Sequence, residues 1–138
     1  MTTCVIPCCG RKLEVAAEAQ RLYCSPNFRT QLFAAGRVAD RVLILSALHG
    51  MVELKTVLKP YDLRMDQRGS ITVEALAAQL VERDLMHEGD QALLPRAYFE
   101  RLATACALAG RPAPFNHFEG TRGIGDQRSV TSRLRRAA

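Results

Sequence analysis

The chain has 138 residues, of which 48% are hydrophobic and 24% charged, a composition typical of one globular domain spanning residues 1–138. No run of about 18 apolar residues occurs, so a membrane span is excluded. The N-terminus lacks the basic segment of a secretion signal, and the five cysteines are odd in number; both features predict a cytoplasmic protein with free thiols. The net charge of +5, from 16 arginines and 3 lysines, favours an anionic partner or reflects a GC-rich genome.

The hydrophobic pattern predicts strands that alternate with helices. Ser25 and Pro26 have the residue types of an N-cap and a first helical position. The predicted strands cover 2–6, 41–46, 91–94 and 113–116, with an irregular stretch over 47–69. The predicted helices cover 14–23, 26–39, 72–87, 96–108 and 127–136. Such alternation indicates an α/β fold: a small, mostly parallel sheet with helices on both faces, in three αβα layers.

Polar residues follow the predicted strand over 41–46, and ligands of open α/β sheets bind beyond the carboxyl ends of the strands. Ser46 could orient a substrate oxygen and His49 could transfer a proton near pH 7, while Gly50 permits a tight turn. The G-x-S-x-G elbow of a serine hydrolase is absent. A purely structural histidine in a turn is the alternative.

The turn after the first strand, residues 8–12, is basic. Gly10 allows a close backbone approach, and Arg11 and Lys12 suit a phosphate, although the spacing of a dinucleotide or P-loop motif is absent. A basic surface turn is the alternative. Because no CxxC pair occurs, we expect no metal site, and no sequence motif indicates a cofactor. A nucleophilic Cys8 or Cys9, activated by the neighbouring basic residues, remains a minority interpretation.

Two later segments also carry chemistry. Tyr61 could stack on a base, and Asp62 could act as a general base or accept from a base edge; a Pro-Tyr turn capped by Asp62 is the alternative. Gly123 and Gly125 precede the last helix, where the helix dipole favours an anion, and Gln127 could bind the amide-like edge of a base. The arginine-rich end of that helix could instead be a solvated tail.

Taken together, several motifs resemble a small family of bacterial and phage proteins that is similar to the YaaA peroxide-stress proteins and to a domain of archaeosine synthases. The motifs are Cys9-Gly10-Arg11-Lys12, Leu45-Ser46-Ala47-Leu48-His49-Gly50-Met51-Val52, Pro60-Tyr61-Asp62 and Gly123-Ile124-Gly125-x-Gln127. The resemblance implies a protein with a uracil-DNA-glycosylase-like fold that acts on or near nucleobases. The chain is shorter than YaaA and lacks the water-activating and His-loop motifs of the true glycosylases.

The first hypothesis is therefore a nucleobase-directed enzyme acting on DNA, RNA or a nucleotide, by cleavage of an N-glycosidic bond or by base modification. A non-catalytic nucleic-acid-binding module and a thiol-based stress-response protein are the alternatives, and a homodimer is compatible with the size of the domain. The predicted catalytic residues are Ser46, His49 and Asp62. The predicted substrate-binding residues are Cys9, Gly10, Arg11, Lys12, Tyr23, Gly50, Tyr61, Gly123, Gly125 and Gln127.

Overall fold

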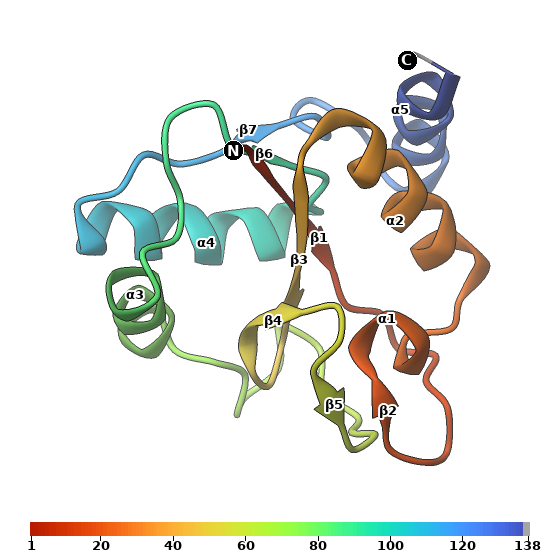
Figure 1. Cartoon of the computed structure of the whole chain (residues 1–138), viewed down its shortest axis with the longest axis horizontal. Coiled ribbons are helices and arrows are strands. Elements are labelled where there is room, and N and C mark those ends of the chain that lie inside the picture. The colour runs from red at the N-terminus through yellow and green to blue at the C-terminus, as the bar shows by residue number, and fades with distance from the viewer. Residues whose placement is uncertain (137–138) are drawn as a thin grey trace.

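Two apolar strands form the centre of a five-stranded sheet in the computed structural model, which describes residues 1–136 (Figure 1). The strand order is β4-β3-β1-β6-β7, and all neighbours are parallel except β4, which pairs antiparallel with β3. The predicted mostly parallel sheet is confirmed. The strands are β1 (Thr3–Pro7), β3 (Arg41–Ser46), β4 (Gly50–Glu53), β6 (Gln91–Ala92) and β7 (Phe115–Asn116).

Helices cover both faces of this sheet, as predicted for three αβα layers (Figure 1). On one face α2 (Pro26–Val38) packs against β1 and β3 and carries α5 (Ile124–Arg136) on its outer side. On the other face α3 (Val73–Glu82) packs against α4 (Arg96–Ala109). The apolar residues of β1 and β3 are buried between these layers because both of their faces are covered.

The helix starts follow from local chemistry. Ser25 Oγ accepts a hydrogen bond from the Phe28 N–H at 3.1 Å, and Pro26 is the first helical residue, which confirms the predicted N-cap. Thr72 caps α3 in the same way, with its Oγ1 accepting from the Ala75 N–H at 3.1 Å. At the other end, α4 stops at Gly110, whose φ of 69° suits a residue without a Cβ.

Several predicted elements have other boundaries in the structure. The predicted strands over 91–94 and 113–116 are reduced to two residues each, β6 and β7. The helix over 14–23 is reduced to α1 (Ala19–Leu22), because the preceding β2 (Ala17–Glu18) pairs antiparallel with β5 (Val57–Leu58). The stretch over 47–69 therefore contains the short strands β4 and β5. The prediction of a helix to residue 87 is wrong by five residues, since α3 ends at Glu82 and the segment beyond it contains two residues of positive φ.

The last helix starts at Ile124 rather than at residue 127, so Gly125 and Gln127 lie inside its first turns. Among residues 1–136, no helix has both the length and the apolar character that crossing a membrane requires.

Candidate functional site

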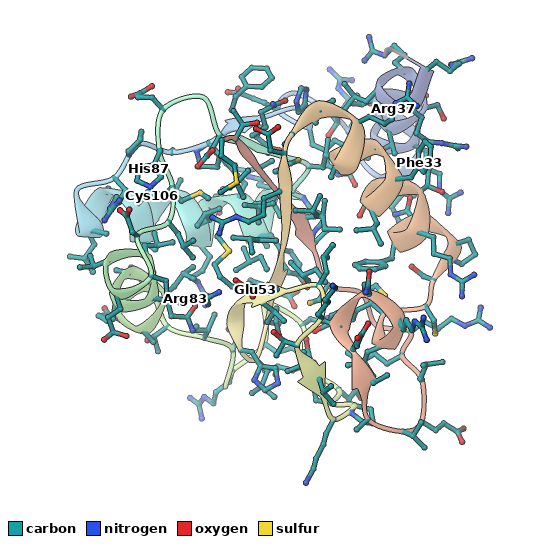
Figure 2. The ribbon with its side chains drawn as sticks, viewed as in Figure 1. Phe33, Arg37, Glu53, Arg83, His87 and Cys106 are labelled. Atoms are coloured by element: carbon teal, nitrogen blue, oxygen red, sulfur yellow. The ribbon has the colours of Figure 1, made fainter. Side chains whose placement is uncertain are left out.

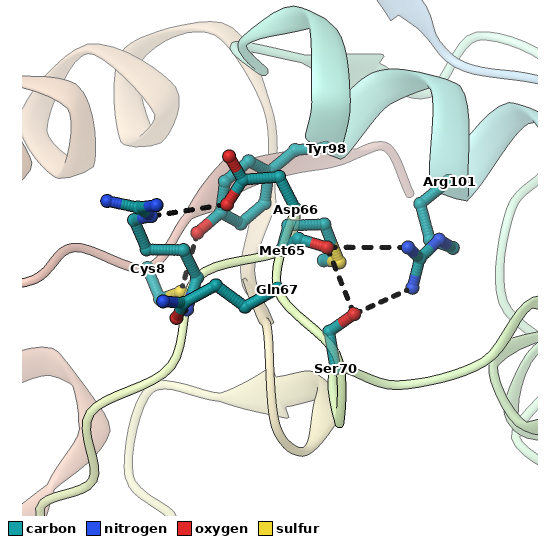
Figure 3. Close-up of polar contacts among 8 residues, drawn as sticks. Cys8, Met65, Asp66, Gln67, Ser70, Tyr98 and Arg101 are labelled. Carbon is teal, nitrogen blue, oxygen red and sulfur yellow. Dashed lines mark hydrogen bonds and ion pairs between the residues drawn. The ribbon is translucent and has the colours of Figure 1, made fainter.

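At the carboxyl edge of the sheet, Cys8 follows β1 and Ser46 is the last residue of β3. The Cys8 N–H donates to the Leu45 carbonyl at 3.1 Å, and Cys8 Sγ accepts from the Ala47 N–H at 3.4 Å. The same sulfur lies 3.2 Å from the Tyr98 hydroxyl of α4 (Figure 3). Cys8 is thus a buried link between β1, β3 and α4 rather than an open thiol.

Arg101 of α4 forms hydrogen bonds with the segment over residues 65–71. Arg101 donates to the Met65 carbonyl at 3.3 Å and to Ser70 Oγ at 3.2 Å (Figure 3). It also donates to the Ile71 carbonyl. The Ile71 N–H in turn donates to the Ala47 carbonyl at 2.7 Å. These bonds hold the loop that follows Tyr61 against the end of β3.

Three hydroxyl groups form a chain at this edge. Ser46 Oγ lies 2.6 Å from the Tyr61 hydroxyl, which lies 2.5 Å from the Tyr23 hydroxyl. Ser46 Oγ also accepts from the backbone N–H groups of Leu48 at 3.2 Å and His49 at 3.0 Å. Since both of its lone pairs are occupied in this way, the Ser46 hydroxyl donates its proton to Tyr61.

The three hydroxyl groups carry one proton more than the hydrogen bonds between them require. Three hydroxyl groups carry three protons, but only two contacts join these groups. One O–H of Tyr61 or Tyr23 therefore has no acceptor among the three hydroxyl groups. Burial raises the pKa of Tyr23 to about 12, and burial also raises the pKa of Tyr61. Both phenols therefore keep their protons at neutral pH, and one phenolic O–H is left without an acceptor among the three hydroxyl groups.

Lys12 brings a positive charge to the same place. Its Nζ lies 4.3 Å from the ring centre of Tyr61 and 5.7 Å from that of Tyr23. This nitrogen is buried, and it has no hydrogen-bond partner within residues 1–136. Contact with the aromatic faces stabilises the ammonium in part, but its three N–H donors remain unused. We call Lys12, Tyr23, Ser46 and Tyr61 the Lys12 site.

The Lys12 site offers more hydrogen-bond donors than free acceptors. A buried ammonium without a partner is costly, and a nearby oxyanion or carbonyl oxygen removes that cost by accepting its hydrogen bonds. The geometry is therefore complementary to an anionic or carbonyl oxygen of a ligand. Within residues 1–136, no three His, Cys, Asp or Glu side chains gather closely enough to hold a metal ion.

His49 and Asp62 lie on the outer side of this site. The His49 ring meets the Tyr61 ring edge-on, with 5.5 Å between the ring centres. Partial burial lowers the pKa of His49, so its imidazole is neutral at pH 7 and able to accept a proton. Asp62 is exposed and makes no hydrogen bond or ion pair with the described residues. Its catalytic role stays a prediction.

The other predicted residues of the first turn are spread over the surface beside Lys12. Cys9 is half-buried, and its Sγ donates to the Arg11 carbonyl at 3.1 Å. Gly10 and the Arg11 side chain are exposed. Tyr23 has no exposed surface, so its ring does not offer a face to a base in this structure. Tyr61 is half-buried with Lys12 over its ring.

A second group of predicted residues lies beyond β6 and β7. A cavity of about 540 Å³ opens there, a volume in the range of small-molecule sites. Gly123 and Gln127 line it together with Phe99 and Arg96, whereas Gly125 does not. Because β1, β3, β6 and β7 are parallel, this cavity and the Lys12 site open toward the same edge of the sheet.

Residues 3–130 match the model of a family of unknown function, DUF6884. The chain belongs to this family. No curated protein and no solved structure matches it. The motifs that form the Lys12 site and the residues that line the cavity all lie within the matched part of this DUF6884 chain.

Two contributors to the DUF6884 site carry no sequence motif. Tyr98 lies in the first turn of α4, and only the fold brings its hydroxyl to Cys8, 90 residues away in the sequence. Gln79 of α3 donates from Nε2 to the His49 carbonyl at 2.8 Å and accepts from the Met51 N–H at 2.9 Å. A polar residue inside the apolar pattern of α3 was the one available signal for Gln79.

Proposed function

We propose that this protein is an enzyme that acts on a nucleobase of DNA, RNA or a nucleotide, at the edge of the sheet where the Lys12 site and the cavity beyond β6 and β7 open. The observation that carries the proposal is the buried Lys12 ammonium, which lacks an acceptor within residues 1–136. A nucleotide supplies such an acceptor as a phosphate oxygen or as a carbonyl of the base. The cavity supports the proposal by its volume and by the Gln127 amide on its wall.

The proposed roles follow from the contacts. Lys12 and the remaining phenolic O–H hold the oxygen of the substrate, and Ser46 positions Tyr61 without touching the substrate itself. Neutral His49 accepts a proton from the reacting group. Asp62, exposed beside Tyr61, is the carboxylate available to stabilise a positively charged sugar if an N-glycosidic bond is cleaved. The kinship with the YaaA proteins and the archaeosine synthase domain stays a prediction.

A cytoplasmic location belongs to the same proposal. All five cysteines are free thiols, and the most buried of them are locked in the core. Free thiols are typical of proteins from a reducing compartment.

Calorimetric titration with uridine and adenosine monophosphates, and with inorganic phosphate, tests the proposed site. We expect Lys12→Met to weaken nucleotide binding by about tenfold or more, because a charge-assisted hydrogen bond contributes about 1.5–3 kcal/mol. Lys55→Met is the matched control, since it removes the same charge from an exposed position on the β4–β5 connection. Equal nucleotide affinities of wild-type and Lys12→Met protein would contradict the proposal.

Activity is measured separately, by mass spectrometry of nucleosides and free bases after incubation with DNA, RNA or nucleotides. Base release or a mass change is the expected result with wild-type protein. We expect His49→Ala to lower the rate by about 10²-fold or more, the usual contribution of a general base. If His49→Ala and Asp62→Asn both keep full activity on the substrate found, the assigned roles are wrong.

A further inference from the structure

The excess positive charge of this protein is concentrated in two neighbouring helices. Helices α2 and α5 together carry six arginines and one aspartate, a net charge of +5. The whole chain also has a net charge of +5, so the remaining residues are balanced, with 13 basic and 13 acidic side chains. Because α5 packs against α2, these arginines come from two neighbouring helices (Figure 1).

A groove lies between the two helices. It has a volume of about 370 Å³ and is lined by Phe33 and Arg37 of α2 and by Ser132, Arg135 and Arg136 of α5. We call these five residues the α2–α5 groove. Phe33 and Arg37 point outward beside α5 (Figure 2). The Phe33 side chain is unusually open for an aromatic residue, with 55% of its surface exposed.

Two of the guanidinium groups lie over this phenylalanine. The Arg37 carbon Cζ is 5.9 Å from the Phe33 ring centre, and the Arg135 carbon Cζ is 5.7 Å from it. Within residues 1–136, neither guanidinium makes an ion pair, and no carboxylate lines the groove. Contact with a ring uses the face of a guanidinium and leaves its N–H edge free for bidentate contact with a phosphate.

We propose that the α2–α5 groove binds single-stranded nucleic acid. A row of arginines without acidic partners matches a phosphate backbone. The exposed Phe33 favours a single strand over a duplex or an acidic peptide, because single-strand sites combine a basic groove with an aromatic platform for bases. Duplex DNA presents its phosphates but hides its base faces, and a peptide carboxylate gains nothing from an open aromatic ring.

This inference deepens the proposed function and rests on it for the identity of the substrate. Phe28, near the start of α2, packs against Tyr23 of the Lys12 site with 5.4 Å between ring centres. Arg37 lies nine residues further along the same helix, about 14 Å away at 1.5 Å per residue. A strand held in the groove is thus within a few nucleotides of the Lys12 site, which makes polymeric DNA or RNA the substrate class.

Fluorescence anisotropy of labelled oligodeoxythymidine and oligouridine of about 16 nucleotides tests the groove at two salt concentrations. We expect Arg37→Gln/Arg135→Gln to weaken binding about tenfold and to reduce the slope of log affinity against log salt by about 1.4, since each single-strand phosphate contact contributes about 0.7. Arg21→Gln/Lys55→Gln removes the same charge from exposed positions elsewhere and leaves both quantities nearly unchanged. Phe33→Leu weakens binding, whereas Phe33→Tyr keeps it, because tyrosine also stacks.

Three results would overturn the inference: duplex DNA or polyglutamate binding more tightly than single strands, equal losses in the two double variants, or full affinity in Phe33→Leu. The two proposals fail separately. Lys12→Met weakens the binding of nucleoside monophosphates, and the loss of oligonucleotide affinity and of salt slope caused by Arg37→Gln/Arg135→Gln is expected in the Lys12→Met background as well as in the wild type. Conversely, Arg37→Gln/Arg135→Gln weakens oligonucleotide binding while nucleoside monophosphates still bind at Lys12.

Discussion

At the scale of a single residue, we expect Lys12 to favour ligand binding and to lower the stability of the ligand-free protein. Its ammonium is buried without an acceptor within residues 1–136 and is stabilised there by two aromatic rings. We expect Lys12→Met to raise the free energy of unfolding by about 1 kcal/mol, because a buried charge is replaced by an apolar side chain of similar length. Urea denaturation of both proteins in a buffer without phosphate measures the difference.

The matched control is again Lys55→Met, whose exposed side chain loses no desolvation cost. Its free energy of unfolding should stay within about 0.5 kcal/mol of the wild-type value. Destabilisation by Lys12→Met, with Lys55→Met unchanged, would mean that the ammonium stabilises the fold by itself. In that case Lys12 would not be poised for a ligand.

At the scale of an element, the connection between β3 and β4 requires glycine at the position of Gly50. Gly50 has a φ of +76°, and a Cβ built there would meet Ile71 Cδ1 at 2.5 Å as well as the Gln79 amide. We expect Gly50→Ala to lower the free energy of unfolding by about 3 kcal/mol through backbone strain and crowding. It should also weaken the bonds by which Gln79 holds His49 and Met51, which chemical denaturation and nucleotide titration both report.

Gly36→Ala is the control for this prediction. Gly36 lies in α2 with an exposed position and no atom within 4 Å of an added Cβ. The substitution should therefore stabilise the protein by about 0.5–1 kcal/mol through helix propensity. Equal effects of the two alanines would contradict the role given to Gly50.

The elements with local signals could be predicted from the sequence. The N-cap at Ser25, the buried run of β3 and the polar cluster after it are read from neighbouring residues alone. The helix over 14–23 was wrong because its pairing partner is distant: Ala17 faces Leu58 across two strands of two residues each. Helical spacing of a few apolar residues does not reveal such a contact.

The candidate site shows the same limit. Lys12 and Tyr61 could be selected by residue type, but the hydroxyl chain that joins Ser46, Tyr61 and Tyr23 depends on contacts 15 and 38 residues apart along the chain. The sequence therefore predicts the chemical groups, while their roles depend on the fold. Ser46 illustrates this, since its hydroxyl is fully engaged inside the protein.

Acid should weaken the whole molecule in two steps, because four groups have pKa values lowered by the fold. Burial lowers the pKa of His49 and of His117 below 6.5. Hydrogen bonds from the backbone of Thr2 lower the pKa of Asp40, and the hydrogen bond from Arg111 lowers that of Asp84, both below 3.8. In every case the unfolded chain binds the proton first, so stability falls with decreasing pH.

The two losses of stability occur in different pH ranges. The contribution of the histidines is complete above pH 6.5 and is lost as the pH falls from there toward their folded values. The contribution of the aspartates is complete above pH 3.8 and is lost below it. Urea denaturation over a pH series should show both steps. His49→Gln/His117→Gln should flatten the upper step and keep the lower one, since glutamine does not titrate but still donates to Gln91 as His117 does. An unchanged upper step in this double variant would show that other groups govern stability there.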